Sequence, residues 1–233
     1  MDMLLDGVNQ ALAALAAGNA EVLQITLRTL QVSGAATLIS LALGIPVGTW
    51  LALVRFRGRA LVLGVVNAGM GLPPVVVGLF LAIMLWRSGP LGGLHLIYSP
   101  TAMIIAQTII AFPIVAGITA SAIQQLDPRL RLQLLGLGAS PAQLVSALWW
   151  QARLPLLSAA MAGFGGAISE VGASMMVGGN IAGQTRIMTT AIALETSRGE
   201  FGQATALGAL LLALSLLVTL AATWLQQRGR ASQ

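Results

Sequence analysis

The residue types that most often carry out chemistry are nearly absent from this chain. It has no cysteine and no lysine, and its single histidine, His95, stands in a loop rich in Gly and Pro. One histidine cannot hold a zinc ion by itself, and without lysine the chain cannot form a Gly-x-x-x-x-Gly-Lys phosphate loop. We therefore expect no catalytic residue, no metal and no cofactor, so that any energy from ATP must come from a partner chain.

One carboxylate, Glu170, stands inside a long apolar stretch. An ionisable group at that depth must face a partner or a water-filled path, not lipid. It could line a permeation route, or it could brace its helix through a hydrogen bond to a neighbouring helix; we favour the brace, because an ionised Glu170 would repel an anionic solute. The spacing of three and four residues predicts a strip of small side chains on the same helix face, formed by Gly163, Ala167, Glu170 and Ser174.

A polar but patterned segment, 127–154, separates two apolar stretches. Ser140 can cap a helix, Pro141 suits its first turn, and Gln143 stands where a capping box requires its third residue, so we predict a helix that begins at about Pro141. Its apolar residues follow helical spacing, and arginines flank it. A short amphipathic helix outside the membrane offers a binding surface to a soluble partner. The apolar positions are Leu144, Val145, Leu148, Trp149 and Ala152.

Composition identifies a multi-span membrane protein. With 57% hydrophobic and 8% charged residues among 233, and a mean hydropathy of +0.87, the chain has too little polar surface for a soluble domain. We expect one all-α domain without internal repeats, preceded by an external or interfacial segment, 1–25, in which 4–17 forms an interfacial helix. The transmembrane domain covers 26–225, with spans at about 26–56, 61–86, 101–125, 156–177 and 201–225, and 226–233 is a tail.

The arginines predict the orientation. They fall in loops, so they indicate topology and not a nucleic-acid surface. Eight lie on one face of the predicted topology and four on the other, and the richer face is the cytoplasmic one, which places the N-terminus outside, the C-terminus inside and the helix at Pro141 in the cytoplasm. The basic ends could also contact anionic membrane lipid. The first face has Arg55, Arg57, Arg59, Arg129, Arg131, Arg153, Arg228 and Arg230; the second has Arg28, Arg87, Arg186 and Arg198.

Two stretches of the sequence resemble a known family. Leu137-Gly138-Ala139-Ser140-Pro141 resembles the cytoplasmic coupling motif of permease subunits of ABC importers with the molybdate/sulfate-type fold. Where that family has Glu-Ala-Ala before the motif glycine, this chain has Leu132-Gln133-Leu134, and Leu154-Pro155 comes later than the motif's Leu-Pro ending. The second stretch resembles the tungstate-specific branch: Ala167-Ile168-Ser169-Glu170-Val171-Gly172-Ala173, Gly178-Gly179-Asn180-Ile181, Thr185-Arg186, and Thr189-Thr190-Ala191-Ile192-Ala193-Leu194-Glu195-Thr196.

The resemblance implies a homodimer of permeases in a bacterial or archaeal cytoplasmic membrane, two cytoplasmic ATPase subunits, and an external solute-binding protein that supplies the oxyanion. Arg186 would then contact the anion, anchor the chain at the interface, or contact the binding protein. Import of molybdate or sulfate is the alternative within the family, and a stand-alone secondary transporter or a membrane scaffold is the alternative outside it. The implied ATPase-coupling residues are Leu137, Gly138, Ala139, Ser140, Pro141 and Gln143; those implied to line or brace the path are Glu170, Ser174, Asn180, Thr185 and Arg186.

Overall fold

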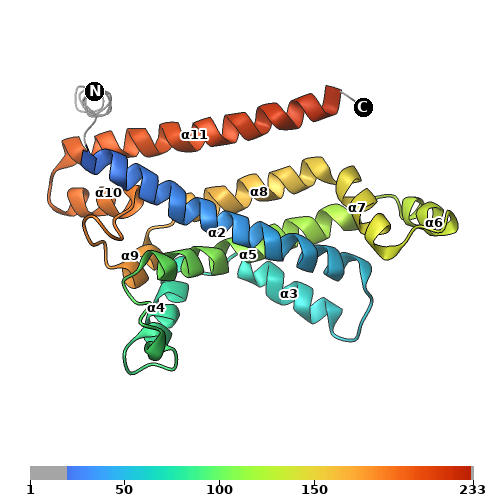
Figure 1. Cartoon of the computed structure of the whole chain (residues 1–233), viewed down its shortest axis with the longest axis horizontal. Helices are drawn as coiled ribbons and strands as arrows, with labels where there is room; N and C mark the ends of the chain where they lie inside the picture. Colours follow the sequence, from blue (N-terminus) through green and yellow to red (C-terminus); the bar gives the residue numbers. More distant parts are fainter. Residues whose placement is uncertain (1–19, 232–233) are drawn as a thin grey trace.

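A computed structural model describes residues 20–231, and within this part every regular element is a helix, as the sequence predicts (Figure 1). The predicted interfacial helix 4–17 lies outside the described residues. The helices are α2 (Ala20–Leu53), α3 (Arg59–Gly69), α4 (Pro74–Leu85), η1 (Gly92–Leu94), α5 (Pro100–Gln124), α6 (Pro128–Gly136), α7 (Pro141–Gln151), α8 (Arg153–Ile168), α9 (Gly172–Gly178), α10 (Met188–Ser197) and α11 (Phe201–Ala231).

Three of the described helices are long and apolar enough to cross a membrane alone: α2, α5 and the Phe201–Trp224 part of α11. Two predicted spans, 61–86 and 156–177, are instead bent pairs, with 101° between α3 and α4 and 57° between α8 and α9. The expected count of five is reached if each pair is one span, and it stays a prediction. Helix α11 continues to Ala231, so most of the predicted tail extends this helix.

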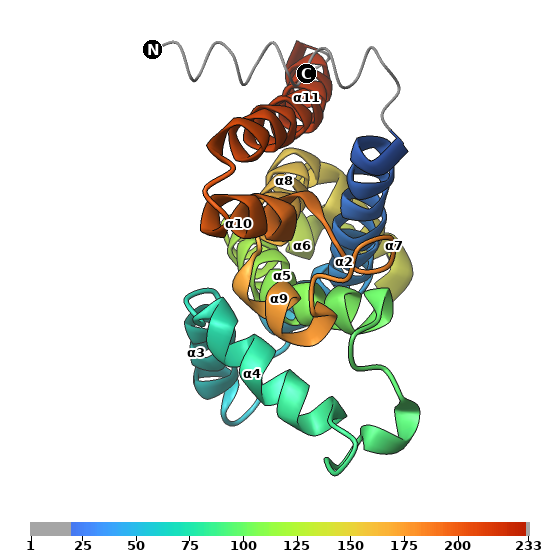
Figure 2. The same cartoon turned by 90° about the vertical axis from the view of Figure 1, so that its left-hand side faces the viewer.

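The centre of the molecule is the contact between α2 and α5, which lie side by side in Figures 1 and 2. Two glycines one turn apart, Gly44 and Gly48, face α5 and let the two backbones approach closely. A Cβ at Gly48 would lie 2.4 Å from the carbonyl oxygen of Ala116, and a Cβ at Gly44 would lie 2.8 Å from the Val115 side chain. Larger residues at these positions would therefore force the two helices apart.

Side chains from later in the chain hold the end of α2. Arg59 Nε donates to the Leu51 carbonyl over 2.7 Å, and Arg131 donates to the Leu53 carbonyl over 3.3 Å. The last carbonyls of a helix lack partners within it and carry partial negative charge, so two guanidinium groups stabilise this end. One turn earlier, Thr49 accepts a 2.8 Å hydrogen bond from the indole N–H of Trp149 on α7. Helices α6 and α7 are thereby fixed to this end of α2.

Helix α4 begins where Leu72-Pro73-Pro74 interrupts the chain. Pro74 occupies its first turn, where the missing N–H costs nothing, and α4 projects from the body beside α9 (Figure 2). The two backbones touch at Gly78, where a Cβ would lie 2.5 Å from the Ala173 Cα. Helix α11 runs along the opposite side (Figure 1), and 11% of its most apolar window is buried, so most of its surface is available to lipid.

Candidate functional site

The predicted capping box at Ser140 is present. The Ser140 hydroxyl accepts from the Gln143 backbone N–H over 3.3 Å, and the Gln143 side-chain oxygen accepts from the Ser140 N–H over 2.8 Å. With Pro141 in the first turn, this reciprocal pair satisfies two N–H groups that the helix itself cannot. Helix α7 therefore begins at Pro141, as the sequence predicts.

Gly138 follows the end of the preceding helix, α6. Its φ of 80° is left-handed, a region that glycine enters without steric cost. The Gly138 N–H bonds the Leu135 carbonyl and the Ala139 N–H bonds the Leu134 carbonyl, each over 3.0 Å. This pair of bonds is a Schellman motif, which satisfies the free carbonyls at a helix end. The motif and the capping box together fix the turn between α6 and α7.

Helix α7 buries one face and leaves the other open. Leu144, Leu148 and Ala152 are buried against Ile123 at the end of α5, while Gln143 and its neighbours face outward. Four large apolar side chains of α6, α7 and the turn between them are exposed. The two helices form one end of the molecule (Figure 1). We call their exposed apolar residues the α6–α7 surface: Leu132 (69% exposed), Leu135 (47%), Leu137 (85%) and Trp150 (69%).

Glu170 lies in the break between α8 and α9, so the predicted single helix face is wrong. Helix α8 ends at Ile168 and α9 begins at Gly172, which leaves Gly163 and Ala167 on one helix and Ser174 on the other. The Glu170 carboxylate is 5% exposed and accepts a 2.6 Å hydrogen bond from the Ala173 N–H. It satisfies a first-turn N–H of α9 that has no partner within the helix. This bond is local, to the helix that directly follows, so the brace that we favoured, a hydrogen bond to a neighbouring helix, stays a prediction.

A buried polar cluster surrounds this break. Gln107 of α5, fully buried, donates to the Ser174 hydroxyl over 3.2 Å, and the Thr189 hydroxyl donates to the Glu170 carbonyl over 2.9 Å. The Gln107 side-chain oxygen has no partner among residues 20–231. The sequence analysis missed Gln107 and Thr189. Gln107 was visible as an amide inside an apolar span, and such polar groups are usually hydrogen-bonded to other helices.

The residues Asn180, Thr185 and Arg186 lie in the loop between α9 and α10, but their polar groups are turned mainly to the protein. The Asn180 amide donates to the Thr190 carbonyl over 3.2 Å, and the buried Thr185 hydroxyl donates to the Gly178 carbonyl over 2.5 Å. Arg186 pairs with Glu21 at 3.3 Å, and its side chain is 15% exposed. Thr185 and Asn180 therefore shape the loop, and Arg186 ties it to the first turn of α2.

The residues predicted to line or brace the path lie together in the structure, far from the residues predicted to couple to an ATPase. Thr189 and Thr190, at the start of α10, connect Glu170 with Asn180 through the bonds given above. The α6–α7 surface lies at the opposite end of the molecule from α9 and α10 (Figure 1). Helices α2, α5 and α8 run between these two ends.

Known transport proteins are similar to this chain in sequence. An anion ABC transporter permease, described as probable, from Haloferax volcanii is 40% identical over 84% of this chain and 86% of that protein. The tungstate uptake system permease protein TupB of Peptoclostridium acidaminophilum is 38% identical over 94% of this chain and 96% of that protein. Several relatives named for molybdenum or sulfate transport are 27% to 30% identical.

The fold matches solved transporters as well. An inward-facing structure of the MetNI methionine ABC transporter superposes with a TM-score of 0.74 at 20% identity, over 90% of this chain and 96% of that one. At this identity the match establishes the fold alone. Residues 44–231 match the model of a family described as the binding-protein-dependent transport system inner membrane component. The chain belongs to this family, and it is the permease of an ABC importer.

Proposed function

We propose that the chain is the permease subunit of a tungstate importer, and that it works as a homodimer with two cytoplasmic ATPase subunits and an external solute-binding protein. The observation that carries the choice of tungstate is the 38% identity to a tungstate uptake permease over nearly the whole of both chains. Relatives named for molybdenum and sulfate transport are less similar, which makes these oxyanions the second candidates. Family membership argues against a stand-alone secondary transporter or a scaffold.

ATP hydrolysis belongs, in this proposal, to the partner chain that binds the α6–α7 surface. Leu137 and Trp150 are large, apolar and mostly exposed. The same end of the molecule carries three arginines at alternate positions, in the loop after α2 and at the start of α3: Arg55, Arg57 and Arg59. Arginine excess marks the cytoplasmic side of a membrane protein. The Trp149 bond to Thr49 would transmit a movement of α7 to α2, so that closure of the ATPase subunits biases the permease between its inward- and outward-facing states.

In this proposal the break at Glu170 stiffens the wall of the translocation path, and it does not bind the solute. The carboxylate is occupied by the Ala173 N–H, and Ser174 is occupied by Gln107. An anion would also be repelled by an ionised carboxylate. Solute selection then lies mainly with the binding protein, and the permease contributes a passage whose walls are held by this polar cluster.

Uptake by the reconstituted complex tests the proposal. Permease, ATPase and binding protein are incorporated into vesicles, and accumulation of labelled tungstate, molybdate and sulfate is measured with and without ATP. We expect ATP-dependent accumulation of tungstate at concentrations at which sulfate is not taken up. Sulfate accumulation without tungstate accumulation would contradict the choice of solute. ATP-independent accumulation by the permease alone would contradict the assignment of energy supply to a partner.

A further inference from the structure

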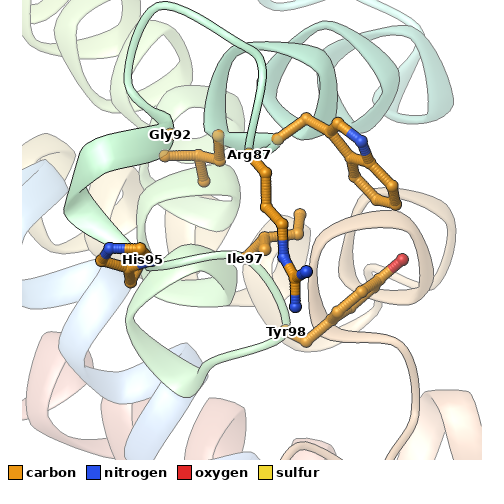
Figure 3. Close-up of a pocket in the computed structure, with 7 residues that line it drawn as sticks. Arg87, Gly92, His95, Ile97 and Tyr98 are labelled. Carbon is orange, nitrogen blue, oxygen red and sulfur yellow. The ribbon is translucent and has the colours of Figure 1, made fainter.

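A pocket at the end of α4 combines unused polar groups with aromatic rings. The cavity measures about 610 Å³ and is lined by Leu85, Trp86, Arg87, Gly92, His95, Ile97 and Tyr98 (Figure 3). The pocket lies outside every contact described so far, on the segment that connects α4 to α5. Our predicted topology places this segment on the external face.

Arg87 is the exposed cation of this pocket. Two other arginines predicted on the same face, Arg186 and Arg198, form ion pairs with Glu21 and Glu195. Arg87 forms neither an ion pair nor a hydrogen bond with any residue in 20–231. Figure 3 shows the Arg87 and Tyr98 side chains toward one side of the pocket and His95 on the other side. A guanidinium with five free N–H donors is suited to bind a carboxylate through two parallel bonds.

The pocket also holds its backbone in an uncommon conformation. Of the three described residues other than glycine with positive φ, two line this pocket: His95 at 50° and Tyr98 at 61°. Such conformations cost free energy and persist where the surrounding structure fixes them, often at binding sites. Here the Tyr98 N–H bonds the Val177 carbonyl over 2.8 Å, and the Tyr98 ring packs on Gly179. The pocket wall is thus joined to the end of α9.

The side chains favour a protein over a small anion as the occupant. Trp, Tyr and Arg are the residues that contribute most to binding at protein interfaces, and Trp86 and Tyr98 are 49% and 43% exposed with their rings edge-on at 6.3 Å. A free oxyanion is usually held by several converging donors. This wide pocket offers one guanidinium, which matches a single carboxylate carried on a protein surface.

We propose that this pocket receives an acidic side chain of the external solute-binding protein, with Arg87 as its counter-ion and Trp86 and Tyr98 as its walls. The inference rests on the proposed function, because it assigns a place to a partner named there. Docking at this pocket would press on Tyr98 and so on the C-terminal end of α9. The binding protein would then act directly on the segment that Glu170 caps.

The test measures the affinity of the purified binding protein for the permease–ATPase complex in lipid nanodiscs, without nucleotide and with ATP bound. Arg87→Gln should raise the Kd by about 30-fold or more, as loss of a central interface arginine does. Arg87→Lys keeps the positive charge but loses the planar guanidinium that forms two parallel bonds. Its Kd should lie between those of wild type and Arg87→Gln. The matched control is Arg198→Gln, an exposed arginine predicted on the same face, which should change Kd by less than about fivefold.

Basal ATPase activity without binding protein should be unchanged in all three variants, which shows that they are folded and assembled. An unchanged Kd for Arg87→Gln would overturn the pocket proposal, even if the wild-type complex imports tungstate. Saturable tungstate binding to the complex without binding protein, lost in Arg87→Gln, would also overturn it in favour of a free-anion site. Failure of the wild-type complex to import any oxyanion would instead count against the proposed function.

Discussion

Replacement of Gly48 by alanine tests the close contact between α2 and α5. The new Cβ would lie 2.4 Å from the Ala116 carbonyl oxygen and 2.8 Å from the Thr119 Cβ. Because both neighbours are fixed in a helix, α5 must move away by about 1 Å to restore an ordinary contact distance. Overfilling a packed core in this way costs about 1 to 3 kcal/mol.

Gly34→Ala, on the same helix, is the matched control. A Cβ at Gly34 would meet no other atom within 4 Å. Both substitutions gain the same helix propensity, about 1 kcal/mol, so the difference between the two variants isolates the contact. We expect Gly48→Ala to be less stable than Gly34→Ala by about 1 to 3 kcal/mol.

The assay is thermal unfolding of the purified complex in one detergent, followed by tryptophan fluorescence. For a chain of this size each 1 kcal/mol corresponds to about 2 to 4 °C in Tm. A Gly48→Ala variant that melts at or above the temperature of Gly34→Ala would refute the close approach of α2 and α5. Loss of uptake with an unchanged Tm would assign Gly48 a role in movement instead of packing.

Topology, turn strain, capping and ion pairing each provide a further test. In this cysteine-free chain, Ser88→Cys should react with an impermeant thiol reagent from outside intact cells and Ser140→Cys only after the cytoplasmic face is opened; outside labelling of Ser140→Cys would reverse the predicted orientation. Gly138→Val, strained by about 1 to 2 kcal/mol at its positive φ, should insert normally but lose ATPase co-purification or coupled uptake, whereas Gly138→Asn should keep both. Glu170→Ala should lower the stability of the complex by about 1 to 3 kcal/mol because a buried N–H loses its acceptor, and Glu170→Gln should lower it less; equal Tm values for all three forms would contradict the brace. Arg186→Gln should lower stability by at most about 1 kcal/mol, as expected for a partly exposed ion pair, and lost uptake with unchanged binding-protein affinity would instead assign Arg186 to the anion.

Features determined by neighbouring residues were predictable from the sequence. The capping box at Ser140 depends on a few consecutive residues, and it is present where predicted. Gly179, which follows the end of α9, has a φ of 68°, a left-handed conformation that is common for glycine at helix ends. The 101° angle between α3 and α4 was not predicted, because α4 packs at Gly78 against a helix nearly one hundred residues away.

The helix break at Glu170 could not be predicted from the pattern of apolar residues. Apolar residues continue on both sides of it, so periodicity extended one helix through 156–177. A glutamate that accepts from an N–H three residues later leaves no signal in hydropathy. Contacts such as Trp149 to Thr49, and Arg131 to the end of α2, join residues far apart in the chain. They depend on the packing of whole helices, which spacing alone does not define.

The two bent pairs have a consequence for how the chain enters the membrane during synthesis. Helices α4 and α9 have 12 and 7 residues, fewer than the roughly 20 that span a bilayer. Backbone groups at their broken ends would meet lipid without hydrogen-bond partners unless other helices already surround them. Helices α2, α5 and the first part of α11 are long and apolar enough to cross a membrane alone. Helices α4 and α9 instead need neighbours such as α5 around their broken ends, so we expect them to take their final positions after α5. Substitutions at Gly78, where the two short helices touch, should accordingly leave a partly inserted chain that membrane quality-control proteases recognise.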